Sequence, residues 1–167
     1  MTKRIKKKLT ITFEKDSRML PFIKFRINGA DGEYLALVDS GSEATLLDSK
    51  VANELTDNPN YKEYEADSMI FDGLGGSVQE GQGRLFSTRI SLADKKEETW
   101  NMEIWGAKIN MEHMHGALMM CSSNHPVSML IGSDTLQRMN AKIDFVKKHL
   151  EICGYAVEED DRATKNS

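Results

Sequence analysis

The sequence has few of the residues that mark several common protein classes. Only two of its 167 residues are cysteines, Cys121 and Cys153, and only three are prolines. Two cysteines are too few for a disulfide-stabilised scaffold, so a reducing compartment, and hence the cytoplasm, is the expected location. No apolar run is long enough for a membrane span or for the central region of a signal peptide, and no membrane association is expected.

An excess of positive charge is also missing. The net charge of −4 argues against a nucleic-acid partner, which would select a basic surface. Residues 1–8, "MTKRIKKK", are basic and are expected to form a solvated extension; contact with nucleic acid or anionic lipid is the less favoured interpretation. Residues 155–167 are expected to form an acidic, disordered tail. Residues 9–154 are long enough for one domain with a sizeable core.

The hydrophobic pattern is mostly that of strands. "LTITF" and "FIKFRIN" alternate between apolar and polar residues, and "EYLALVD" is apolar on both faces, which predicts a strand buried on both sides. Helical patterns are short and occur around residues 49–55 and 133–140. The sequence therefore predicts a mostly β fold, a small barrel or sandwich, with one or two short helices.

Three motifs follow one another along the chain. They are Asp39-Ser40-Gly41 after an apolar strand, the glycine-rich stretch "MIFDGLGGSV" at 69–78, and "MLIGSDTLQRMNAKIDF" at 129–145. In this order they resemble the retropepsin-like aspartic peptidases, the family of retroviral and retrotransposon proteases. The resemblance covers roughly residues 20–150. It implies a small, closed, barrel-like retropepsin half that is active as a homodimer, with a flap at about 69–80 and an elaborated loop at about 93–126.

The resemblance makes Asp39, Ser40 and Gly41 the catalytic residues. Two carboxylates that share one proton can activate water, because two like charges that close cannot both ionise. The ionised carboxylate takes a proton from the water and the protonated one polarises the scissile carbonyl. The sequence holds a single Asp-(Ser/Thr)-Gly motif, so a second protomer would supply the second carboxylate. This chemistry requires no metal and no cofactor.

The expected substrate-binding residues are Gly73, Leu74, Gly75, Gly76 and Ser42. The glycine-rich stretch would close over an extended peptide and bond to its backbone; a plain flexible hairpin turn is the alternative. Retroviral enzymes typically carry alanine at the position of Ser42. Its hydroxyl is expected to favour the ionised carboxylate and to make the pH optimum more acidic than that of a retroviral enzyme.

The chain also departs from the retroviral pattern in a predicted dimer contact. Glu43 offers the acid that these enzymes place after the catalytic loop, but Ser133 stands where they carry an arginine. Arg84 and Arg138 are the candidates to replace that arginine. Asp134 next to Ser133 is interpreted as an acid in the first turn of a helix.

Further along, His113, His115, Cys121 and His125 are residue types that bind zinc. Their spacing matches no tight zinc template, so we expect no metal site and interpret them as polar residues of the elaborated loop. Leu130, Ile131 and Gly132 are expected to pack beneath the catalytic loop as structural residues.

These features favour an aspartic endopeptidase that cleaves extended peptide segments. The main alternative is a non-catalytic retropepsin-fold module that binds peptides or dimerises. A third hypothesis is an unrelated β-barrel in which Asp39 is an ordinary turn carboxylate that accepts backbone N–H groups.

Overall fold

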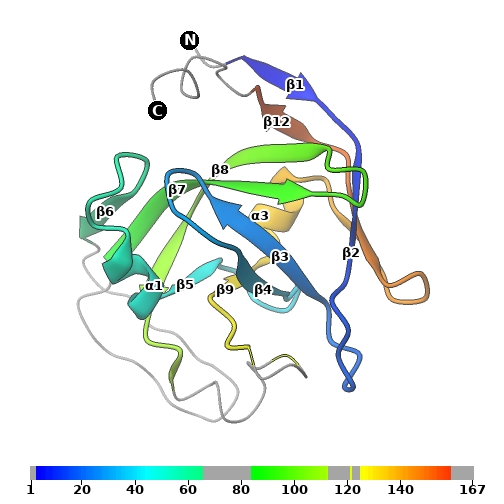
Figure 1. The fold of residues 1–167 in the computed structure, drawn as a ribbon, viewed down its shortest axis with the longest axis horizontal. Coiled ribbons are helices and arrows are strands. Elements are labelled where there is room, and N and C mark those ends of the chain that lie inside the picture. The colour runs from blue at the N-terminus through cyan, green and yellow to red at the C-terminus, as the bar shows by residue number, and fades with distance from the viewer. Residues whose placement is uncertain (1–2, 66–83, 113–120, 122–124, 159–167) are drawn as a thin grey trace.

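The structure is a computed structural model that describes residues 3–65, 84–112, 121 and 125–158 of the chain. Most of the described residues lie in strands, and the two described helices are short (Figure 1). Neither described helix is long and apolar enough to cross a membrane. The elements are β1 (Arg4–Lys6), β2 (Leu9–Thr12), β3 (Phe22–Ile27), β4 (Tyr34–Val38), β5 (Leu46–Asp48), α1 (Ser49–Glu54), β6 (Lys62–Glu65), β7 (Arg84–Ala93), β8 (Thr99–Ile109), β9 (Met129–Ile131), α3 (Ser133–Arg138), β10 (Lys142–Asp144), β11 (His149–Ile152) and β12 (Tyr155–Val157).

Six strands form a closed barrel. The pairing runs β3–β4–β9–β5–β8–β7 and returns to β3 at Ile90 and Ser91 of β7, while β6 pairs with the first part of β7, at residues 84–87. The β4–β9 and β5–β8 pairs are parallel and the other pairs of the ring are antiparallel. The predicted small barrel with two short helices is therefore confirmed.

The barrel interior follows from the alternation of side chains along its strands. On β7, Phe86, Thr88, Ile90 and Leu92 point inward and are buried, while the alternate residues Ser87, Arg89 and Ser91 face outward. On β4, Ala36 and Val38 join this interior cluster, whereas Leu35 belongs to a second apolar cluster on the other side of the strand. The prediction that this strand is buried on both faces is confirmed.

The chain ends differ from the expectation. β1 pairs with β12, which places residues 4–6 and 155–157 side by side (Figure 1). Ala156 is only 2% exposed. Ordered structure thus extends past both expected domain boundaries, at residues 9 and 154. The reason is that strand pairing uses main-chain groups, so a short charged strand can form without an apolar pattern that would reveal it.

Candidate active site

Asp39 lies directly after β4, at the carboxyl end of the parallel pair that β4 forms with β9. Val38 stands opposite Ile131 in this pair, and the Asp39 N–H donates to the Ile131 carbonyl at 2.9 Å. The backbone of Asp39 is therefore fixed to the barrel by its neighbouring strand. Asp39 itself is half-buried, while Ser40 and Gly41 are exposed on the surface of the protomer.

The turn after β4 is closed around the Asp39 carboxylate. The Gly41 N–H donates to Asp39 Oδ1 at 2.9 Å, and the Ser42 N–H donates to the Asp39 carbonyl at 3.2 Å. A Cβ at position 41 would lie 3.2 Å from Asp39 Oδ1. The close approach to the carboxylate favours glycine here. The geometry orients the carboxylate and leaves it at the protomer surface.

The second half of the loop is held by a buried threonine. The Thr45 hydroxyl donates to Asp134 Oδ1 at 2.8 Å, and the Thr45 N–H donates to Asp134 Oδ2 at 3.2 Å. Thr45 Oγ1 also accepts the Gly132 N–H at 3.2 Å and lies 2.6 Å from Thr135 Oγ1. Thr45 is fully buried. The loop is thus bonded to the start of α3 through side chains as well as backbone.

Sequence reasoning missed Thr45 and gave Asp134 too small a role. Asp134 lies in the first turn of α3, as expected, but its carboxylate also binds Thr45, 89 residues earlier in the chain. The available signal was a polar residue inside the apolar stretch "ATLL". A buried hydroxyl requires a partner, and the partner had to come from another element.

Gly132 allows α3 to approach the loop at the backbone level. The Ser133 N–H donates to the Ser42 carbonyl at 2.7 Å. A Cβ on Gly132 would lie 2.4 Å from the Ala44 carbonyl oxygen. This position therefore tolerates no side chain without a backbone shift. This close packing agrees with the structural role expected for residues 130–132.

The interpretation of Ser42 needs correction. Its hydroxyl donates to the Ala44 carbonyl at 2.8 Å, so its single proton is not directed at the Asp39 carboxylate. The expected donation to the ionised aspartate is therefore absent from this arrangement. The structure therefore does not support the expectation of a pH optimum more acidic than that of a retroviral enzyme.

Both candidate arginines have partners within the protomer. Arg84 pairs with Glu63 at 3.2 Å. The Arg138 guanidinium lies 3.5 Å from the ring centroid of Trp105 and donates to the Glu103 carbonyl. In the described part of the chain, neither arginine contacts Glu43. The predicted replacement of the missing interface arginine is thus not present within one protomer.

Several predicted residues lie outside the described part of the chain. They include Gly73, Leu74, Gly75 and Gly76 of the expected flap, and His113 and His115 of the elaborated loop. Of the remaining candidate zinc ligands, Cys121 Sγ lies 3.4 Å from the Lys15 carbonyl oxygen. Within the described ranges, no three His, Cys, Asp or Glu side chains group closely enough to hold a metal ion.

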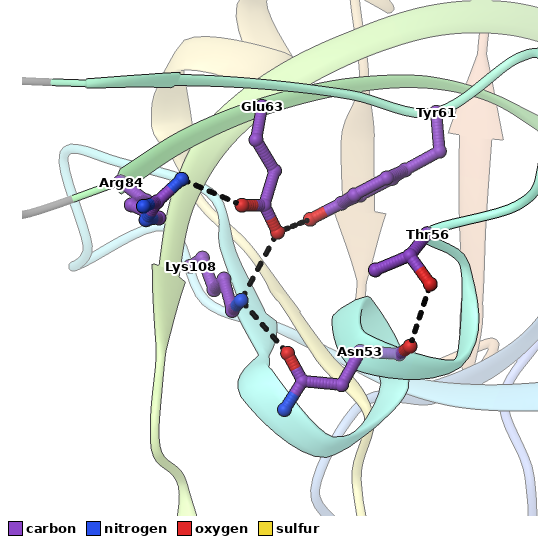
Figure 2. A network of polar contacts seen from close by, with 6 residues as sticks. All are labelled: Asn53, Thr56, Tyr61, Glu63, Arg84 and Lys108. Atoms are coloured by element: carbon purple, nitrogen blue, oxygen red, sulfur yellow. Dashed lines mark hydrogen bonds and ion pairs between the residues drawn. The ribbon is translucent and has the colours of Figure 1, made fainter.

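A polar network joins the described ends of β6 and β7, on either side of the expected flap (Figure 2). Glu63 Oε1 accepts the Tyr61 hydroxyl at 2.9 Å and Lys108 Nζ at 3.0 Å, while Oε2 accepts Arg84 at 3.2 Å. Lys108 also donates to Asn53 Oδ1 of α1 at 2.8 Å. One carboxylate thereby links three strands and a helix.

The pKa of Glu63 reflects this network. Burial raises the pKa, but the bonds from Lys108 and Tyr61 and the charges of Lys108 and Arg84 outweigh it and lower the net value. Burial and the bond to Glu63 raise the pKa of Tyr61, so its hydroxyl remains a donor at neutral pH. The ionised form of Glu63 is therefore the one that the folded protein stabilises.

Glu63→Gln is expected to lower the free energy of unfolding by about 1–2 kcal/mol at neutral pH, because two cations lose their partner. A lowered folded-state pKa contributes stability above the ordinary carboxyl value, and this contribution is lost as the pH falls through the folded value. The difference from wild type should therefore disappear in acid. Urea unfolding of both proteins at neutral pH and at about pH 3 measures it. Exposed Glu65, on the same strand, gives the control Glu65→Gln; an equal loss in that variant would contradict the role of the network.

Comparisons with known proteins bear on the fold. No model of a known protein family matches the chain, and no curated protein matches it. Among solved structures, a retropepsin-like aspartic protease from Rickettsia conorii superposes with a TM-score of 0.53 at 15% identity, covering 95% of this chain and 98% of that one. The retroviral protease-like domain of Ddi1 from Leishmania major gives a TM-score of 0.48 at 16% identity, covering 85% and 98%. The likeness to the Rickettsia conorii structure shows that the chain has the retropepsin-like aspartic protease fold, and the resemblance seen in its motifs is confirmed at the level of the fold.

Proposed function

We propose that this protein is an aspartic endopeptidase that acts as a homodimer, with water activated between the Asp39 carboxylates of two protomers. The observation that supports this most directly is the Asp39-Ser40-Gly41 turn at the end of β4, held against β9 and α3 in a retropepsin-like fold. The turn lies at the protomer surface, where a second copy can reach it.

In such a dimer, the two Asp39 carboxylates share one proton. The pair titrates as a unit, with one apparent pKa raised and the other lowered. The ionised carboxylate is the general base for water and the protonated one is the general acid at the scissile carbonyl. The exposed Ser40 hydroxyl is available to bond across to the partner loop. No metal or cofactor takes part in these steps.

The proposed substrate is an extended peptide segment. Residues 73–76 would cover it as a flap, and its backbone would pair with theirs as an added strand. Ser42, on the same loop as Asp39, would face the substrate. A cytoplasmic location is part of the same proposal.

Cleavage of a diverse peptide mixture, measured by mass spectrometry from about pH 3.5 to 7.5, tests the proposal. Specific activity should rise with protein concentration, because only dimers hold both carboxylates. Sedimentation under the same conditions reports the fraction of dimer. A folded, dimeric protein that cleaves nothing would instead support the non-catalytic module that binds peptides or dimerises.

A further inference from the structure

A hollow of about 1000 Å³ lies on the outer face of the barrel, where β3, β7 and β8 adjoin. Arg26 stands opposite Ser91 of β7, and Ser91 stands opposite Asn101 of β8. Arg89 is two residues from Ser91 on the same strand and therefore faces the same side. The intervening residues Ile27 and Ile90 point into the core. One polar row thus crosses three strands outside the barrel.

The two arginines that line this hollow, Arg26 and Arg89, are available to bind a ligand. Among the described residues, no hydrogen bond or ion pair is found for the Arg26 or the Arg89 guanidinium. By contrast, Arg18 pairs with Asp16 at 3.0 Å. Their positions make them diagonal neighbours, about 7–8 Å apart at the backbone. Two like charges at this spacing repel, and a bound anion would offset that repulsion.

The floor and the rim of the hollow limit what can bind. Asn101 lies in the lining and is only 5% exposed, so a buried amide stands behind the two arginines. Three carboxylates also line the hollow, those of Glu33, Glu97 and Glu158. They equal in number the three cations of the lining, Lys24, Arg26 and Arg89, and they disfavour a polyanion such as nucleic acid. A ligand with one localised anionic group suits this distribution.

We propose that the hollow binds a small molecule through a carboxylate or phosphate group held between Arg26 and Arg89. The guanidinium fork matches both groups, because two parallel N–H donors meet two oxygens. A volume of about 1000 Å³ leaves room for the uncharged remainder of the molecule. The site therefore recognises an anionic end group of a small ligand.

This site is separate from the candidate active site. Glu33, on its rim, precedes β4, whereas Asp39 follows β4. Six residues of extended chain separate the two positions, which corresponds to roughly 20 Å. The proposal does not depend on peptidase activity, and its test uses binding alone.

The test is an NMR titration of the full chain with inorganic phosphate and, separately, with succinate, at constant ionic strength and neutral pH. At least one probe should give saturable shifts for residues 24–28, 89–91 and 99–101 below about 50 mM. Saturation by phosphate alone or by succinate alone identifies the end group. No saturable shift at these residues with either probe would overturn the proposal.

Arg26→Gln/Arg89→Gln should weaken binding at least about tenfold, since each charge-assisted bond contributes strongly. The control Lys62→Gln/Lys147→Gln removes the same charge from two other exposed positions and should leave the affinity unchanged. If the arginine-to-glutamine protein does not fold, Arg26→Lys/Arg89→Lys keeps the charge and removes the fork, and a loss of at least about threefold is expected. Equal affinities in the arginine variant and the control would overturn the proposal.

Discussion

Asp39→Asn is expected to abolish peptide cleavage and to leave the fold intact. Asparagine keeps the shape of the side chain and can still accept the Gly41 N–H, now held by the Asp39 carboxylate at 2.9 Å. It cannot share a proton as a carboxylate pair does, so water loses its general base. Loss of a catalytic group of this kind lowers the rate by about a thousandfold or more. Turnover of a peptide found in the cleavage screen measures the loss.

A matched control is available in another turn. The Asp94 carboxylate also accepts backbone N–H groups, from Lys96 at 2.8 Å and Glu98 at 3.0 Å, and Asp94 is half-buried, as Asp39 is. Asp94→Asn should retain full activity. If Asp39→Asn instead destabilised the protein and left cleavage intact, Asp39 would be an ordinary turn carboxylate, as in the third hypothesis.

Mixing the two proteins tests whether the site is shared between protomers. In an equimolar mixture of wild type and Asp39→Asn, each wild-type protomer finds a wild-type partner about half of the time. Activity per wild-type protomer should then fall to about half, once subunits have exchanged. Unchanged activity per wild-type protomer would show that one chain suffices.

The second large effect is expected for Gly132→Ala. The new Cβ would lie 2.4 Å from the Ala44 carbonyl oxygen and 2.9 Å from the Ser42 carbonyl oxygen. Both are backbone atoms, so relief requires that the loop and α3 move apart. Separation also breaks the bond from the Ser133 N–H to Ser42. We expect a loss of about 3–5 kcal/mol in the free energy of unfolding, more than is usual for overpacking, because the clash is with backbone atoms and a backbone hydrogen bond is lost as well.

Chemical denaturation followed by circular dichroism measures this loss. Ser133→Ala is the appropriate control, because it keeps the neighbouring backbone bond and adds no atom near the loop. It should change stability by less than about 0.5 kcal/mol. A Gly132→Ala protein as stable as this control would show that the close approach of loop and helix is not required.

The sequence was sufficient for β2, β3 and β4 and for the order of the motifs, whereas the barrel strand β5 was not predicted. The alternation in "LTITF" and "FIKFRIN" is a local property, and it predicted which residues of β2 and β3 face the core. Thr45 and Asp134 could not be paired in advance, because their contact depends on how β5 and α3 are brought together by the closed ring. Local patterns also failed for β1 and β12, two strands of three residues that pair through main-chain groups and of which β1 carries two charged residues.

The hydrogen-bond partner of the Ser42 hydroxyl could not be predicted from the sequence either. Its residue type is compatible with bonding to the Asp39 carboxylate or to a nearby carbonyl. The choice of Ala44 follows from the path of the loop, and the loop path is set by the contact with Gly132. The residue type determines which hydrogen bonds a side chain can make, and the surrounding backbone determines which of them forms.

The parallel pairing of β4 with β9 also has a consequence for how the protein is made. Ala36 stands opposite Met129, 93 positions later in the chain. During synthesis the segment around Asp39 therefore leaves the ribosome long before the residues that hold it. Contacts of such high sequence separation form slowly, because a long loop must close first. The nascent chain carries its aspartate without the framework that orients it, so assembly of this loop is a late event in folding.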